Sequence, residues 1–242
     1  MVKASSNLGT ASMKRVFAIH GWTYNLNKWS DLSKALYQRG VELVLLKVPG
    51  LTMPSDKVWT INDYVEWLNN NLNGVANPIV IGHSNGGRIA LCYVQKYPGK
   101  LAQLILIDSA GVAHDQKQSL RKLKVLKALS NIGKPLGNVP GARQAFYKVI
   151  GARDYYEAPP NMRLTMQNML AADRSIDFGS IKLPVSIIWG ENDKITPIAD
   201  GHKIHASIAG STFEIVPEAT HSPFYNHPDK VADIIIRAIG KT

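Results

Sequence analysis

Apolar residues in this chain gather in short β-branched runs, and these alternate with amphipathic segments. Six such runs predict strands, at residues 15–21, 41–50, 78–84, 101–111, 184–193 and 211–219. Five amphipathic segments predict helices, at residues 28–40, 60–72, 85–99, 197–210 and 229–240. Nearly continuous Val, Ile and Leu runs separated by helices are typical of a parallel sheet covered on both faces. The chain is therefore predicted to be an α/β protein with a mostly parallel sheet of about six strands.

The alternation stops between residues 112 and 180, where helix-like pieces are interrupted by Gly and Pro. An insertion after one strand is expected to form a helical cap over the carboxyl edge of the sheet, where open α/β sheets place their sites. The predicted organisation is an N-terminal extension at 1–14, a core at 15–111 and 181–242, and a cap at 112–180. Met13 is a candidate natural start.

The composition indicates one globular domain with an insertion: 242 residues, 45% hydrophobic and 19% charged. No apolar run approaches the roughly 20 residues that span a bilayer, and the first 15 residues lack the apolar core of a secretion signal. The single cysteine, Cys92, excludes an internal disulfide and favours a reducing, cytoplasmic location. Its apolar helical context predicts a buried structural thiol.

The net charge of +10 is concentrated in the expected cap. Between 117 and 148 there is no acidic residue, and the basic ones are Lys117, Arg121, Lys122, Lys124, Lys127, Lys134, Arg143 and Lys148. One interpretation is a cap helix whose charges simply face water. The other is a surface that attracts an anionic substrate, an acidic polymer or a membrane surface. No nucleic-acid-binding motif accompanies the charge, so a nucleic-acid partner is disfavoured.

One serine lies at a predicted corner between a strand and a helix, in Gly82-His83-Ser84-Asn85-Gly86. Glycines on both sides allow a tight turn, and the turn makes the hydroxyl of Ser84 project above the sheet. The N–H of Asn85 lies at the helix N-terminus, where unpaired donors and the dipole favour an anion. The alternative is a glycine-rich turn with an incidental serine.

A serine hydroxyl becomes a good nucleophile only beside a base, and the base is usually oriented by a carboxylate. Four histidines lie at predicted strand ends or in loops: His20, His83, His221 and His227. Two aspartates follow predicted strands, Asp108 and Asp193. Residue chemistry alone leaves these alternatives open.

The stretches W-G-E-N-D-K-I-T-P at 189–197 and H-S-P-F at 221–224, together with G-H-S-N-G, resemble the α/β-hydrolases. The similarity covers nearly the whole chain from about residue 15, within the small capped carboxylesterase, lipase and C–C hydrolase group. It implies Ser84 as nucleophile, His221 as base and Asp193 as acid, in the chain order of this fold. It also implies that His227 begins the last helix and that Asp108 makes structural hydrogen bonds.

An acyl-transfer site also needs an oxyanion hole. The resemblance implies two backbone donors, the N–H groups of Asn85 and Trp22, with His20 shaping the loop that carries Trp22. The aromatic residues Trp22, Tyr24 and Phe224 adjoin catalytic segments and are expected to line a substrate pocket, although each could equally pack in the core.

The sequence also departs from the family pattern, since Lys47 stands where an Asp is usual before Pro-Gly. The expected activity is hydrolysis of a small-molecule carboxylic ester, without metal or cofactor. C–C bond hydrolysis on the same triad and a non-catalytic ligand receptor are the alternatives. Epoxide hydrolase and haloalkane dehalogenase are disfavoured because those relatives carry Asp at the position of Ser84. The sequence carries no signal for an oligomeric state.

Overall fold

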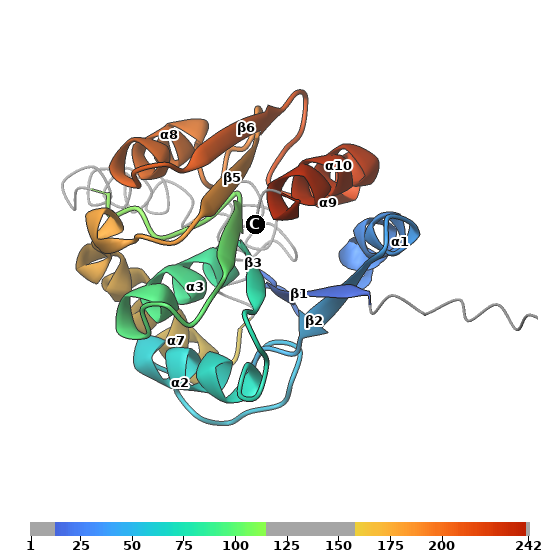
Figure 1. Ribbon diagram of the computed structural model, residues 1–242. Coiled ribbons are helices and arrows are strands. Elements are labelled where there is room, and N and C mark those ends of the chain that lie inside the picture. The colour runs from blue at the N-terminus through green and yellow to red at the C-terminus, as the bar shows by residue number, and fades with distance from the viewer. Residues whose placement is uncertain (1–12, 115–157, 241–242) are drawn as a thin grey trace, which may run out of the picture.

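The computed structural model describes residues 13–114 and 158–240 (Figure 1). The basic segment from Lys117 to Lys148 and most of the predicted cap therefore lie outside the described residues. Within the described ranges, no helix is long and apolar enough to cross a membrane.

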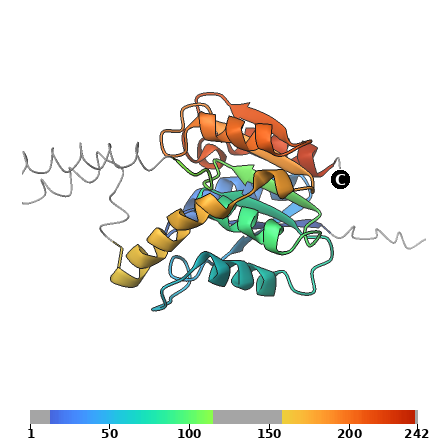
Figure 2. The same ribbon diagram turned by 90° about the vertical axis from the view of Figure 1, so that its left-hand side faces the viewer.

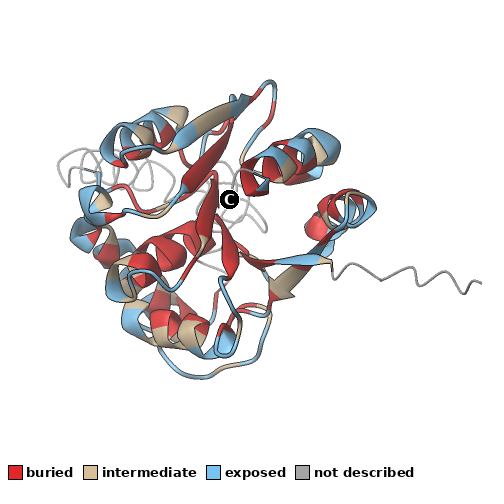
Figure 3. Cartoon of the chain, viewed as in Figure 1, coloured by how far each residue is buried: buried red, intermediate tan, exposed pale blue. Residues whose placement is uncertain are grey.

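Six parallel strands form one sheet in the order β2-β1-β3-β4-β5-β6. They are β1 (Lys14–Ile19), β2 (Val41–Leu46), β3 (Ile79–His83), β4 (Gln103–Ile107), β5 (Val185–Gly190) and β6 (Thr212–Val216). Every residue of β3, β4 and β5 is buried, whereas the edge strands β2 and β6 are partly exposed (Figure 3). This burial explains why the central strands read as unbroken apolar runs. The six-stranded parallel sheet confirms the predicted α/β class.

Helices cover both faces of the sheet (Figure 1). One face carries α1 (Ser30–Gln38), α9 (Pro223–Asn226) and α10 (Pro228–Ile239); the other carries α2 (Ile61–Asn71), α3 (Asn85–Lys96), α7 (Pro160–Ala172) and α8 (Ile198–Ser207). Short 3-10 turns occupy η1 (Asn27–Trp29), η3 (Asp173–Ser175) and η4 (Phe178–Ser180). Most apolar core residues thus face one of two layers of helices.

The predicted helix starts and stops follow from local chemistry. Thr60 caps α2 as expected: its side chain accepts from Asp63 N–H, and the Asp63 carboxylate accepts from Thr60 N–H at 2.8 Å. Gly40 follows α1 with φ +80°, a conformation that favours glycine. The predicted strands were too long at their carboxyl ends, because the polar residues there belong to the loops of the site.

A polar stripe on α7 fixes this helix to the loop before α2. Asn161 donates to Ser55 O at 3.0 Å, Thr165 accepts from Trp59 N–H at 2.9 Å, and Asn168 donates to Trp59 O at 3.1 Å. Residues at this spacing share one helix face. Figure 2 shows α7 as a long arm whose first turn lies away from the sheet. The returning leg of the insertion is therefore held in a fixed register against the core.

Candidate active site

The strand register brings five loops to one edge of the sheet. Ile19 pairs with Gly82, His83 with Ile107, and Ile107 with Ile188. The loops that follow β1, β3, β4, β5 and β6 therefore begin at a common level. They carry, in chain order, Trp22, Ser84, Asp108, Asp193 and His221.

Ser84 forms a strained corner between β3 and α3. Its φ of 53° and ψ of −120° are unusual for a residue with a Cβ, so the surrounding contacts must hold it there. Ser84 N–H donates to Ile107 O at 3.2 Å, and Ser84 O accepts from Ala110 N–H at 3.0 Å. A Cβ on Gly86 would lie 2.1 Å from Ile19 O, so only glycine lets α3 begin this close to β1.

His221 and Asp193 form the hydrogen-bonded pair of the site. The distance from His221 Nδ1 to Asp193 Oδ2 is 2.7 Å, and the Asp193 side chain is 0% exposed. Because a carboxylate can only accept, Nδ1 carries the hydrogen and Nε2 keeps a free lone pair. The Ser84 hydroxyl makes no hydrogen bond to another residue between 13 and 114 or 158 and 240, so the Ser84–His221 contact stays a prediction.

A dense set of donors keeps Asp193 charged. Burial would raise its pKa, but His221, Thr196 and the Ile195 N–H outweigh burial and hold the pKa below its ordinary value. Asp193 Oδ1 accepts from Ile195 N–H at 2.7 Å, and Oδ2 accepts from Thr196 Oγ1 at 2.7 Å. An ionised carboxylate suits the role of orienting an imidazole and stabilising its protonated form.

His83, the variable residue of the serine motif, supports His221 by a hydrogen bond to its backbone carbonyl. Its Nε2–H donates to the carbonyl of His221 at 2.7 Å. Burial, and then the charge of His221, lower the pKa of His83 to about 3, so the ring is neutral at neutral pH. Phe224 packs edge-on against His83 at 4.8 Å and stacks on Trp29 at 4.0 Å. Phe224 is 1% exposed, so its ring takes the core position that the sequence had left as an alternative.

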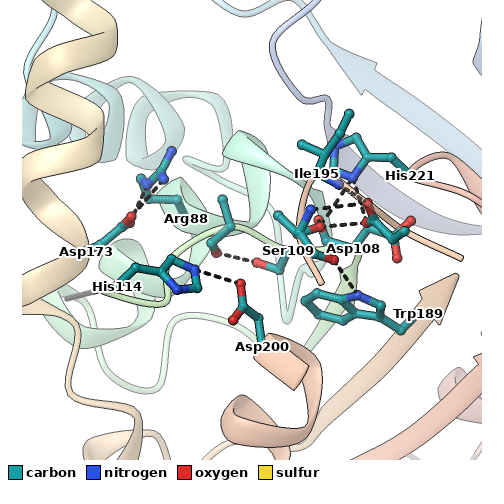
Figure 4. A network of polar contacts seen from close by, with 12 residues as sticks. Arg88, Asp108, Ser109, His114, Asp173, Trp189, Ile195, Asp200 and His221 are labelled. Atoms are coloured by element: carbon teal, nitrogen blue, oxygen red, sulfur yellow. Dashed lines mark hydrogen bonds and ion pairs between the residues drawn. The ribbon is translucent and has the colours of Figure 1, made fainter. Parts of the chain in front are cut away.

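Asp108 is placed beside this pair but is not bonded to His221. Its Oδ1 accepts from Gly190 N–H at 2.7 Å, and its carbonyl oxygen lies 3.2 Å from Thr196 Oγ1, whose hydrogen is directed to Asp193 at the shorter distance of 2.7 Å. These contacts tie the ends of β4 and β5 together, as the sequence had led us to expect for Asp108. Figure 4 shows Asp108 next to His221 and Ile195, with a second group of ion pairs across the view.

The second group contains Arg88 and Asp173. Arg88 Nε and Nη2 bind the two Asp173 oxygens at 2.5 and 2.9 Å, and both side chains are almost fully buried. Arg88 Nη1 also donates to Asn85 Oδ1 at 2.6 Å. Beside this pair, His114 Nε2 contacts Asp200 Oδ2 at 3.0 Å (Figure 4). The start of α3, which carries the serine corner, is thereby linked to the turn after α7.

The loop after β1 approaches the serine corner closely. A Cβ on Gly21 would lie 2.9 Å from Ser84 Cβ. His20 fixes this loop, with Nδ1–H donating to Gly21 O at 2.7 Å and Nε2 contacting Thr52 Oγ1 at 2.7 Å. Burial lowers the pKa of His20, which favours its neutral form, and the two contacts agree with the loop-shaping role that the resemblance implied.

The two expected oxyanion residues lie at this junction. Asn85 is the first residue of α3, so its N–H has no acceptor within the helix. Trp22 Nε1 and Asn85 Nδ2 are buried and have no hydrogen-bond partner among the described residues. Tyr24, expected to line the pocket, is 51% exposed.

Two further sequence expectations can be placed. His227 is the N-cap of α10, as expected of a residue that begins the last helix. Cys92, expected to be buried, is only partly buried. Desolvation still raises the pKa of its thiol to about 12, so the thiol stays protonated at neutral pH, which fits a structural role.

Three groups of the site also have the residue types of metal ligands. One atom each of His83, Asp108 and His221 lie within 4.8 Å of one another. Ligands around a tetrahedral zinc ion lie about 3.4 Å apart. His83 and His221 already use one ring nitrogen each for the contacts above, so we assign no metal site to these groups.

Comparison with known proteins agrees with this architecture. A family model described as "alpha/beta hydrolase fold" matches residues 14–228. The chain belongs to the alpha/beta hydrolase fold family.

Individual relatives within this family are distant. The monoacylglycerol lipase ABHD6 of Homo sapiens is 24% identical over 91% of this chain and 74% of its own length. A 2-hydroxy-6-oxononadienedioate/2-hydroxy-6-oxononatrienedioate hydrolase of Klebsiella pneumoniae is 23% identical, over 93% and 87%. Among solved structures, the esterase EaEST from Exiguobacterium antarcticum has a TM-score of 0.69 and 20% identity, over 95% and 92%. These matches support a hydrolase.

Proposed function

We propose that this protein is a serine hydrolase that cleaves carboxylic esters, with Ser84 as nucleophile, His221 as base and Asp193 as acid. The observation that carries the proposal is the 2.7 Å bond from His221 to a buried Asp193 at the sheet edge. Ser84 stands at the same edge in a strained turn, as a nucleophile on a strand–helix corner requires. Esterase and lipase relatives favour ester substrates.

In the proposed reaction, His221 Nε2 takes the Ser84 proton as the hydroxyl attacks the ester carbonyl. The N–H groups of Asn85 and Trp22 bind the oxyanion, and each donor contributes on the order of 3 kcal/mol. His221 then protonates the leaving alcohol, and water repeats the sequence on the acyl-enzyme. Asp193 fixes the tautomer throughout. Each step uses a side chain or N–H group of this chain, and the scheme needs no cofactor.

The first experiment is a panel of p-nitrophenyl esters of graded acyl length, run beside labelling with a fluorophosphonate. Wild type is expected to hydrolyse the esters and to be labelled at Ser84, and Ser84→Ala to do neither. Ser211→Ala is the matched control, since Ser211 hydrogen-bonds His205 away from the site. Labelling at a serine other than Ser84 would refute the site assignment.

The Klebsiella relative makes C–C bond hydrolysis the second candidate. A vinylogous diketone offered to the same enzyme separates the two reactions, because an esterase should process it far more slowly than the best p-nitrophenyl ester. The reverse order of rates would favour C–C hydrolysis. Binding of a ligand without turnover of either substrate would favour a receptor.

The substrate is proposed to be a small molecule. The basic residues of segment 117–148 are candidates for attracting anionic groups of that substrate. Electrostatic attraction is screened by salt. An ester with a carboxylate should therefore lose turnover as salt rises, while a neutral ester of similar size should not. Equal salt responses would mean that the charges only face water, and co-sedimentation with anionic vesicles tests a membrane surface.

A further inference from the structure

Asp108 is a buried carboxyl group that the proposed reaction does not use. It follows β4 in a left-handed backbone conformation, with φ +43°, and is 0% exposed. Its Oδ1 accepts from Gly190 N–H, but its Oδ2 has no hydrogen-bond partner among the described residues. Within residues 13–114 and 158–240, no Lys or Arg forms an ion pair with it.

The groups around Asp108 are those of the proposed triad. A carboxyl oxygen of Asp108 lies within 4.8 Å of a ring nitrogen of both His83, from β3, and His221, from the loop after β6. Asp193, from the turn after β5, is the charged group that faces it. Thr196 joins the two acids, since its Oγ1 contacts Asp193 Oδ2 at 2.7 Å and the Asp108 carbonyl at 3.2 Å. The imidazole of His221 therefore has the carboxyl groups of both Asp193 and Asp108 beside it.

These surroundings favour a different protonation state for each acid. Asp193 has several hydrogen-bond donors, whereas Asp108 has one, and a buried charge without partners is costly. Burial raises the pKa of Asp108 to about 8; the Gly190 N–H opposes this and the negative charge of Asp193 adds to it. Two neighbouring carboxyl groups thus share a single negative charge at neutral pH.

We propose that Asp108 is a reserve acid of this site, protonated while Asp193 is ionised and able to orient His221 when Asp193 cannot. When Asp193 cannot orient His221, Asp108 releases its proton to solvent, and one of its carboxylate oxygens accepts the Nδ1–H of His221. The net charge beside the imidazole stays at one negative unit. A carboxyl oxygen of Asp108 lies within 4.8 Å of a ring nitrogen of His221, and the proposal requires this oxygen to move to about 2.8 Å from Nδ1. This inference rests on the proposed serine hydrolase function, with Asp108 as a positioning residue.

The decisive comparison is between Asp193→Asn and the double variant Asp193→Asn/Asp108→Asn, measured by kcat on the best ester. Loss of a triad acid with no replacement lowers kcat by about 10⁴-fold in a serine protease. We expect Asp193→Asn to keep kcat at least about tenfold above the double variant, because a nearby carboxylate still stabilises the imidazolium. Equal kcat values for the single and double variants would overturn the proposal.

The pH dependence separates orientation of the base from a purely structural role. In Asp193→Asn, turnover requires ionised Asp108, so kcat should rise with pH around the pH at which half of the Asp108 carboxyl groups are ionised. This midpoint pH should lie below that of wild type, because the charge of Asp193 is gone. Asp193→Asn/Asp200→Asn is the matched control: Asp200 is also buried but is paired with His114. This control should keep the pH profile of Asp193→Asn, and the same loss in both double variants would contradict the proposal.

A measurement without substrate distinguishes failure of this inference from failure of the proposed function. In protein labelled with ¹³C at the Asp carboxyl carbons, the resonance absent from Asp108→Asn identifies Asp108. We expect a protonated group at pH 7, with a lower midpoint in Asp193→Asn. An ionised Asp108 at pH 7 would refute the proposal whatever the esterase activity. Absent wild-type turnover and labelling would instead refute the proposed function.

Discussion

The bond from His83 to the backbone of the base offers a quantitative test of how the site is held. His83→Phe keeps an aromatic ring beside the stacked pair of Trp29 and Phe224 but removes the Nε2–H that donates to His221 O at 2.7 Å. A typical hydrogen bond contributes about 1 kcal/mol, and a buried acceptor left without a donor costs roughly 1–3 kcal/mol. The free energy of unfolding should therefore fall by about 1–3 kcal/mol.

The same substitution should also lower the rate of catalysis. The His221 carbonyl loses its donor, so the imidazole can shift relative to Ser84, its proposed partner, and a misplacement of about 1 Å can cost about 10²-fold in rate. We expect kcat to fall by roughly that factor with KM little changed. Urea unfolding measures the first quantity, and steady-state hydrolysis of a p-nitrophenyl ester measures the second.

A matched control is His205→Phe on α8. His205 is also partly buried, stacks on Phe213 at 5.7 Å, and binds Ser211 Oγ at 2.8 Å. Its replacement should lower stability modestly and leave kcat unchanged. If His83→Phe kept both wild-type kcat and wild-type stability, the 2.7 Å contact would not be what positions the base.

Three further predictions follow from buried groups. His83 stays neutral in the fold down to a pKa of about 3 but protonates near 6.5 when unfolded, so unfolding takes up a proton in between. Stability should fall as pH falls through this window, and His83→Phe should lessen the slope in urea titrations. Arg88→Met leaves Asp173 buried without its partner and should cost about 3–5 kcal/mol in urea unfolding. Gly86→Ala places a Cβ against Ile19 O and should abolish fluorophosphonate labelling.

A surface ion pair provides the control for Arg88→Met, and the outcomes that would contradict the last two predictions can be stated. Arg15 pairs with Glu42 at 3.1 Å with both side chains about half exposed, so Arg15→Met should change stability by no more than about 0.5 kcal/mol. An equally small effect of Arg88→Met would contradict the importance of the buried pair. Wild-type labelling of Gly86→Ala would show that the serine corner tolerates a side chain.

The sheet and the candidate acid–base pair could be predicted because their signals are local. Apolar runs mark each strand, and Asp193 and His221 lie within a few residues of strand ends in recognisable loops. Parallel pairing then brings those ends together whatever lies between them. Asp193 rather than Asp108 bonds His221, which agrees with the choice that the family resemblance had implied.

The supporting contacts could not be read from the chain, because they join residues far apart in sequence. His83 occupies a variable position of its motif, and its partner carbonyl is 138 residues away. Arg88 and Asp173 are 85 residues apart, and neither lies in a motif that signals a partner. The only hint was the polarity of His83 in a fully buried strand, since a buried polar group needs a partner.

The two anchors of the insertion, the contact between His114 and Asp200 and the polar stripe of α7, have a consequence for how this chain can vary. The chain leaves the core beside one anchor and rejoins it at the other, and the two are made by separate parts of the fold. We therefore expect that a different sequence could replace the stretch between them while the residues at the candidate active site stay the same. Such a replacement is expected to change the range of substrates.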